Sequence, residues 1–179
     1  MPVVRGRSIR VLYDEAAIKA RNAELAAEIA ASGYDNLLVI SILKGSFVFA
    51  ADLIRALHDS GLAPEVEFIS LSSYGAGTES SGAVRVVKDI ESDVAGRDVL
   101  LIDDILESGR TLSFARSLME ERGARRVGIA VLLEKPGKRA VAIDAEHIGF
   151  VCPDLFVVGY GMDAAHAFRE LPFVGVVEE

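Results

Sequence analysis

Residues 99–112 constrain the fold of this chain more than any other stretch. They read Val-Leu-Leu-Ile-Asp-Asp-Ile-Leu-Glu-Ser-Gly-Arg-Thr-Leu. The apolar run over residues 99–102 is typical of a strand covered on both faces of a parallel sheet, and it ends abruptly in Asp103 and Asp104. Apolar residues then recur at helical spacing from Leu112 onward. The stretch therefore predicts a strand, an acidic pair, a short polar loop and a helix, in that order.

The polar loop from Glu107 to Thr111 has the composition of a phosphate site. Because it leads into a helix, backbone N–H groups and the positive end of the helix dipole point into it. Gly109 permits close approach of an anion, and Arg110 adds a permanent cation. Ser108 and Thr111 can donate hydroxyl hydrogen bonds. The loop therefore predicts a phosphorylated ligand, while the preceding acidic pair suits ribose hydroxyls, Mg²⁺ or a developing cation.

The size and hydropathy of the chain fit a single domain over residues 1–179. It is 51% hydrophobic with a mean hydropathy of +0.33, which suffices for a large buried core. Its longest apolar runs, such as residues 37–43, are far shorter than the roughly 20 residues that cross a bilayer. The N-terminus lacks the basic-then-apolar plan of a signal peptide. We therefore expect no membrane partner and a cytoplasmic location.

The net charge and the few His and Cys residues argue against a nucleic-acid-binding protein, a histidine-based metal site and a disulfide-bonded fold. The formal net charge of −8 disfavours nucleic acid as a partner, so an anionic ligand needs local cationic islands. His58, His147 and His166 have no metal-ligand spacing, and we expect them in surface or hydrogen-bonded positions. The single Cys152 excludes an internal disulfide and is expected to be a buried structural thiol.

Strands and helices alternate along the rest of the chain. We expect one helix that Asp14 caps and that ends near Gly33, and another over about residues 46–60. Strands are expected within residues 3–13, 36–43, 65–73, 84–88, 126–133, 147–151, 156–158 and 173–177. The alternation predicts an α/β fold with a parallel β-sheet core flanked by helices. The N-terminal and C-terminal segments, with the late short strands, are expected to form a small hood over the carboxyl edge of the sheet.

Residues 99–112 resemble the signature loop of the type I phosphoribosyltransferases, which bind 5-phosphoribosyl 1-pyrophosphate (PRPP). The resemblance extends over about residues 13–177 and implies the fold of that family. It implies that Asp103 and Asp104 hold the ribose side of PRPP as catalytic residues and serve as metal ligands. It also implies that the 5-phosphate is held by Ser108, Gly109, Arg110 and Thr111.

Two further motifs resemble those of the hypoxanthine-guanine members of the family. Lys44 and Gly45 resemble a pyrophosphate-binding loop in which the peptide bond before the lysine can be cis. Lys135, in Leu-Leu-Glu-Lys-Pro, resembles the lysine that contacts the exocyclic oxygen of a 6-oxopurine. A lysine has only donors, so it prefers a 6-oxo acceptor to the 6-amino group of adenine.

Residues 154–163 resemble the C-terminal motif of the same enzymes. In that motif the aromatic at Phe156 stacks on the purine and the backbone near Val157 meets its edge. Asp163 is similar to the carboxylate that holds Mg²⁺ on the pyrophosphate. Arg169 resembles the pyrophosphate-binding arginine, and its planar guanidinium suits phosphate oxygens.

The Gly- and Ser-rich linker at about residues 74–83 is compatible with a loose hairpin. With Ser73 and Tyr74 beside it, the linker resembles the mobile lid that closes over the active site of the family and excludes water. One position departs from the family pattern, because Glu107 stands where an Asp is usual. That residue exchanges a proton with N7 of the purine, and Glu lengthens the reach of the carboxylate by one methylene.

The resemblance implies a purine-salvage transferase that uses PRPP and Mg²⁺ to convert a 6-oxopurine, hypoxanthine or guanine, into IMP or GMP. A homodimer or homotetramer is usual for such enzymes. Two alternatives stay open from the sequence. One is a xanthine-preferring transferase, since discrimination at the purine 2-position depends on backbone placement. The other is a non-catalytic PRPP- or nucleotide-binding regulator on the same fold, such as an RNA-binding pyrimidine-operon regulator.

Overall fold

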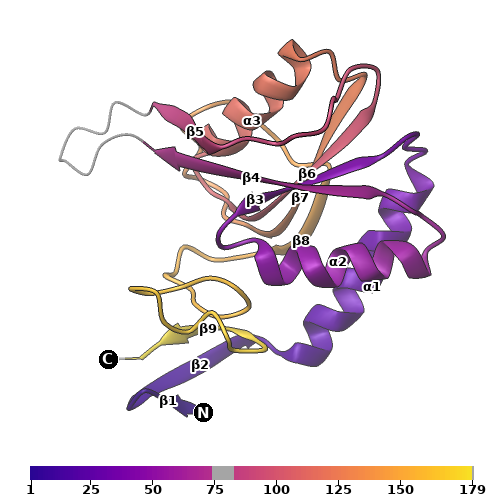
Figure 1. The fold of residues 1–179 in the computed structure, drawn as a ribbon. Coiled ribbons are helices and arrows are strands. Elements are labelled where there is room, and N and C mark those ends of the chain that lie inside the picture. The colour runs from indigo at the N-terminus through magenta and orange to yellow at the C-terminus, as the bar shows by residue number, and fades with distance from the viewer. Residues whose placement is uncertain (74–82, 179) are drawn as a thin grey trace.

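A computed structural model describes residues 1–73 and 83–178, which form two sheets and three helices (Figure 1). The helices are α1 (Glu15–Ala31), α2 (Phe47–Asp59) and α3 (Arg110–Glu121). The strands are β1 (Val3–Val4), β2 (Arg7–Tyr13), β3 (Leu38–Leu43), β4 (Glu65–Ser73), β5 (Val84–Lys88), β6 (Asp98–Leu106), β7 (Arg126–Glu134), β8 (His147–Val151) and β9 (Val174–Val177). No helix in this described part of the chain is long and apolar enough to cross a membrane.

The larger sheet has the strand order β5-β4-β3-β6-β7-β8 and is parallel except for β5, which runs antiparallel to β4. This confirms the predicted α/β fold with a mostly parallel core. Asp14 caps α1 as expected, because its Oδ1 accepts a hydrogen bond of 2.8 Å from the N–H of Ala17. The helix ends at Ala31, shortly before Gly33.

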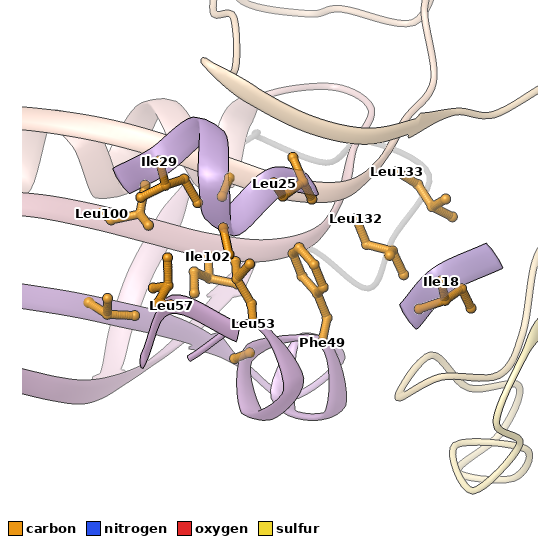
Figure 2. Packing of buried hydrophobic residues seen from close by; sticks show 14 of the residues in the cluster. Ile18, Leu25, Ile29, Phe49, Leu53, Leu57, Leu100, Ile102, Leu132 and Leu133 are labelled. Carbon is orange, nitrogen blue, oxygen red and sulfur yellow. The ribbon is translucent and has the colours of Figure 1, made fainter. Parts of the chain in front are cut away.

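Helices cover both faces of the larger sheet, which explains its unbroken apolar strands. Side chains alternate between the two faces along a strand, so successive residues over 99–102 enter different clusters. On β6, Leu100 and Ile102 pack against α1 and α2, whereas Val99 and Leu101 pack with α3. Figure 2 shows the first cluster, in which Phe49 of α2 lies among side chains of α1, β6 and β7.

Strand β6 is longer than the sequence predicts. The expected strand ends before Asp103, but β6 continues through the acidic pair to Leu106, and α3 begins directly after Gly109. The reason lies in the neighbouring strand, because β7 also runs one residue further than expected and pairs Glu134 with Leu106. The backbone that carries the two carboxylates therefore belongs to a paired strand rather than to a turn.

The hood differs in part from expectation. β1, β2 and β9 form the small antiparallel sheet, as predicted for the terminal segments. Residues 147–151, expected among the hood strands, instead form β8 and extend the larger sheet beside β7. Their buried first residue, His147, favours that covered position. Residues 156–158 contribute only a single bridge from Val158 to Gly175.

Candidate active site

A cleft opens at the carboxyl ends of the parallel strands, where open α/β sheets bind their ligands. It consists of two adjoining cavities of about 350 and about 560 Å³. Lys44, Gly45, Asp104 and Glu107 line both, so the cavities form one continuous site. The cleft therefore brings together predicted site residues from four parts of the chain: the ends of β3, β6 and β7, and the C-terminal segment.

The smaller cavity contains the predicted phosphate loop. Ser108, Gly109 and Thr111 line it just before and within the first turn of α3. Gly109 has a φ of 80°, a left-handed conformation that directs the chain into the helix and that favours glycine. Arg110 lies outside the residues that line the two cavities, and its backbone N–H lies 3.4 Å from Ser108 Oγ. Backbone donors and hydroxyls, rather than the Arg110 side chain, thus face this cavity.

The acidic pair occupies the floor between the cavities. Asp103 is buried and lines the smaller cavity, whereas Asp104 lines both. Asp103 Oδ1 accepts from the Asp104 N–H at 2.9 Å, and Asp104 Oδ1 accepts from the Ile105 N–H at 2.8 Å. Burial, followed by the neighbouring Asp104 charge, raises the pKa of Asp103 well above its usual range. Both causes favour the protonated form of Asp103.

The turn from β3 to α2 presents Lys44 and Gly45 to the cleft. The Leu43–Lys44 peptide bond is cis, as it can be in the resembling loops. A Cβ on Gly45 would overlap the Asp104 carboxyl group, so only glycine lets the turn approach the acidic pair. Ser46 Oγ donates to the carbonyl oxygen of Ile42, and this carbonyl can only accept. The 2.8 Å contact between the buried Ser41 and Ser46 hydroxyls is consequently donated by Ser41.

The larger cavity brings the base-binding candidates together. Lys135 is 6% exposed, and its Nζ lies 3.8 Å from Glu107 Oε1. Phe156 and Val157 line the same cavity, with the Phe156 ring 67% exposed and Val157 buried. An exposed ring beside a buried ammonium and a carboxylate can stack on a planar heterocycle and bind its polar edge.

Lys138 is a neighbour of Glu107 that sequence reasoning missed. Its Nζ lies 3.7 Å from Glu107 Oε1 and 2.7 Å from Asp154 Oδ1. These carboxylates, that of Asp154 foremost, raise the pKa of Lys138. Glu107 therefore lies between two ammonium groups. No motif marks Lys138, because its role depends on how the loop after β7 folds back.

Asp163 and Arg169 line the larger cavity near Lys44. Arg169 Nη2 lies 2.9 Å from Asp163 Oδ1, and Arg169 Nη1 donates to the Gly161 carbonyl at 2.6 Å. Asp163 Oδ2 accepts from the His166 N–H at 2.7 Å. The cation and the carboxylate that were expected to serve the pyrophosphate are thus paired with one another.

The carboxylates of the cleft suit Mg²⁺, which prefers oxygen ligands. Among residues 1–73 and 83–178, no group of three or more His, Cys, Asp or Glu side chains is placed to hold a metal alone. Mg²⁺ typically needs only one or two carboxylates together with substrate phosphates and water. Asp104 and Asp163, which both line the larger cavity, fit that incomplete donor set.

Tyr160 anchors the C-terminal motif and was also missed from sequence. Its hydroxyl donates to Asp52 of α2 and accepts from Asn22 Nδ2 of α1 at 3.0 Å. Tyr160 has a positive φ of 52°, between the two positive-φ glycines Gly159 and Gly161. A Cβ on Gly161 would overlap the Gly45 carbonyl, so the motif lies directly on the β3–α2 turn.

Several expected residues lie outside the cleft or outside the described chain. Tyr74 and residues 74–82 of the expected lid are not among the described residues. Ser73 ends β4 and pairs with Val84, whereas Ser70 and Ser72 line the larger cavity. His147 is buried with its Nε2 3.1 Å from the Tyr34 hydroxyl, and Cys152 is a buried free thiol, as expected for structural groups.

Residues 8–165 match the family described as the phosphoribosyl transferase domain. Fold, phosphate loop and family match together define the class as a phosphoribosyltransferase. The hypoxanthine phosphoribosyltransferase of Escherichia coli K12 is 44% identical over 174 residues, covering 95% of this chain and 96% of the relative. A solved hypoxanthine-guanine phosphoribosyltransferase from Bacillus anthracis is 40% identical with a TM-score of 0.89, covering 96% of this chain and 100% of that one. The chain therefore belongs to the hypoxanthine phosphoribosyltransferase family.

A longer relative matches over the same region. The bifunctional protein TilS/HprT of Listeria innocua is 45% identical over 171 residues, which are 94% of this chain. The chain spans 26% of the length of that relative.

Proposed function

We propose that this protein is a purine-salvage transferase that moves the 5-phosphoribosyl group of PRPP to N9 of hypoxanthine and of guanine. The products are IMP or GMP and pyrophosphate. The observation that carries the proposal is the continuous cleft, which the loop after β6, the acidic pair and the buried Lys135 all line. Glu107 lines both of its cavities, and its Oε1 lies 3.8 Å from Lys135 Nζ. A PRPP molecule and a planar base need such an arrangement, with the base above the ribose carbon.

In the proposed reaction, N9 of the purine bonds to ribose C1 as the C1–oxygen bond breaks and pyrophosphate leaves with the electron pair. Glu107 accepts the proton from N7, and Lys135 donates to the 6-oxo group. The loop formed by Ser108, Gly109 and Thr111 holds the 5-phosphate. The acidic pair faces the ribose, where it stabilises the positive charge that develops at C1.

Lys44 and Arg169 are proposed to bind the departing pyrophosphate. Asp163 and Asp104 or Asp103 would hold Mg²⁺ together with phosphates of PRPP, and the ion would supply charge neutralisation of that leaving group. Arg169 becomes available to phosphate oxygens when its pairing with Asp163 is exchanged. We also propose that residues 1–179 act as one domain, that the protein works in the cytoplasm, and that it assembles as a homodimer or homotetramer.

The base preference is tested by measuring nucleotide formation from PRPP and Mg²⁺ with hypoxanthine, guanine, xanthine, adenine and uracil side by side. Turnover of hypoxanthine or guanine that requires Mg²⁺ is the expected result. A dominant rate with xanthine would reassign the base. If no base reacts while PRPP still binds, the regulator alternative replaces the enzyme, and a salt-dependent RNA shift assay would test it directly.

A further inference from the structure

Arg139 makes an unusual set of contacts behind the catalytic loop. Its Nη1 donates to the carbonyl of Glu107 at 2.8 Å, with the carbonyls of Leu106 at 3.3 Å and Lys135 at 3.5 Å nearby. Its Nε donates to the Ile143 carbonyl at 3.1 Å, and its Nη2 pairs with Glu134 Oε1 at 2.6 Å. One guanidinium thus joins the end of β6, the end of β7 and the following loop.

Arg139 reaches this loop from outside the cleft. It lines a separate cavity of about 510 Å³, together with Arg116 and residues 142–146. It is not among the residues that line either cavity of the active site. From this position its guanidinium contacts the backbone that carries Glu107 and Lys135, and any effect on the reaction must pass through those residues.

The rest of the loop has its own support. The Ser108 carbonyl accepts from the N–H groups of Ala140 at 2.9 Å and Val141 at 3.3 Å. A Cβ on Gly109 would overlap the Ile143 side chain, so the loop is packed closely against this segment. These contacts use backbone and apolar groups and do not need the guanidinium. The phosphate side of the loop can therefore keep its place when the Arg139 side chain changes, whereas the Glu107 carbonyl loses its direct donor.

We infer that Arg139 is a positioning residue that fixes Glu107 relative to Lys135 and so sets the geometry of the base proton transfer. The inference rests on the proposed role of Glu107. A lysine cannot make the same contacts as Arg139, because its three donors lie on one nitrogen. The guanidinium uses Nε, Nη1 and Nη2 for acceptors that lie apart from one another. Glu107 has a longer side chain than the usual Asp, so its reach depends all the more on where its backbone is held.

The test compares Arg139→Lys with Arg116→Lys. Arg116 is the matched control, since its side chain is also 23% exposed and pairs with Glu146 at 2.7 Å, away from the loop. We expect Arg139→Lys to lower kcat by about tenfold to a hundredfold, the range that a small misplacement can cost. The KM for PRPP should change less than threefold, and Arg116→Lys should leave both constants near those of the unchanged protein.

A double variant separates positioning from general loss of structure. If Arg139 acts through Glu107, adding Arg139→Lys to Glu107→Gln should lower kcat little further. The inference would be overturned if the kcat loss of the double variant equalled the product of the two single losses. It would also be overturned if Arg139→Lys lowered kcat no more than Arg116→Lys does. If Glu107→Gln alone leaves kcat unchanged, the proposed role of Glu107 as proton acceptor is wrong, and this outcome is distinct from a failure of the Arg139 inference.

Glu134→Gln covers the case in which Arg139→Lys does not fold. This change keeps the length of the side chain but removes the charge that holds Arg139 Nη2. We expect a smaller kcat loss of the same kind, again with little change in the KM for PRPP. A folded Glu134→Gln protein with unchanged kcat would contradict the positioning role.

Discussion

Two turns at the carboxyl edge of the sheet join a strand to a helix, and they are stabilised in different ways. The β3–α2 turn is held from within, by the Ser41 and Ser46 hydroxyls and the Ile42 carbonyl. The β6–α3 loop is held from outside, by Arg139 and by backbone donors of residues 140 and 141. The first turn is fixed within a few residues of chain, whereas the second depends on a segment about thirty residues later.

This difference separates two tasks of the site. The β3–α2 turn presents Lys44 and Gly45 to the cleft, and its proposed task of binding the leaving group requires only that the turn keep a fixed shape. In the proposed function, the β6–α3 loop holds a phosphate and also aims the Glu107 carboxylate at a base bound by Lys135, which directly follows β7. Arg139 links the loop to the end of β7, and this link serves the second task because it fixes Glu107 and Lys135 relative to each other.

The largest expected effect is on the β6–α3 side. Glu107→Gln removes the proton acceptor but keeps the size of the side chain, so kcat should fall by about 10²- to 10⁴-fold. The Kd for PRPP should change far less, because Ser108, Gly109 and Thr111 remain in place. Steady-state kinetics together with PRPP binding would check this. An unchanged kcat would remove Glu107 from the mechanism.

The next largest effect should fall on the β3–α2 turn. Gly45→Ala places a Cβ where the Asp104 carboxyl group lies, so either the turn or the acidic pair must move. We expect kcat/KM for PRPP to fall by about a hundredfold, as a displacement of about 1 Å can cause. Gly61→Ala is the control for the change of residue type, since Gly61 follows the end of α2, lines neither cavity, and a Cβ there meets no atom within 4 Å. The strain of its positive φ of 90° should lower stability and leave kcat/KM unchanged. Equal losses in the two variants would contradict the steric explanation.

A smaller effect, on stability alone, is expected at the opposite edge of the sheet. Hydrogen bonding to Arg125, at 2.8 and 2.7 Å, holds the pKa of the buried Asp98 below its usual range. Because the pKa is lower in the folded state, this contribution is full above the unfolded pKa of about 4 and is lost as the pH falls through the folded value. Asp98→Asn should lower Tm by roughly 3–6 °C near neutral pH.

The difference in Tm between Asp98→Asn and the unchanged protein should shrink below about pH 4. The KM for PRPP should stay constant, since Asp98 lies at the amino end of β6. Melting curves across pH, with kinetics at neutral pH, would show both results. A Tm difference that is the same at every pH would contradict the role of the carboxylate charge.

The smallest expected effect tests the internal support of the β3–α2 turn. Ser46→Ala removes the hydroxyl between Ser41 and the Ile42 carbonyl and should cost about 1–2 kcal/mol of unfolding free energy. Ser32→Ala is the matched control, because Ser32 Oγ also donates to a carbonyl, that of Glu28 at 2.8 Å, but on an exposed helix end. Denaturant unfolding of both variants would measure the difference. Equal losses would mean that burial of the Ser46 hydroxyl adds nothing.

The sequence predicted most of the elements that place the site. Apolar runs located β3, β6 and β7, because strands covered on both faces need apolar residues at nearly every position. The boundaries were less accurate at β6, where ladder pairing with β7 carries the strand past Asp103. The place of β8 was wrong, since five residues with little periodicity do not indicate which sheet they join.

The candidate site was predictable where a motif is local and was not where contacts are distant. Lys44, Lys135 and Asp163 stand in short motifs that resemble a family, and each lines the larger cavity. Lys138 and Arg139 follow Lys135 closely, yet their partners Asp154 and Ile143 are fixed only by the path of the loop. Side-chain contacts of this kind depend on three-dimensional register, which residue spacing does not contain.

The contact between Gly161 and Gly45 has a consequence for the order of folding. Strand β6, helix α3 and residues 139–143, which together support the loop from Glu107 to Thr111, are complete in the chain before Gly161 and Arg169 are synthesised. β9 then pairs with β2 across nearly the whole length of the chain, and such long-range contacts form late. A growing polypeptide can therefore shape the β6–α3 loop first, and the C-terminal segment that brings Asp163 and Arg169 to the cleft takes its place last.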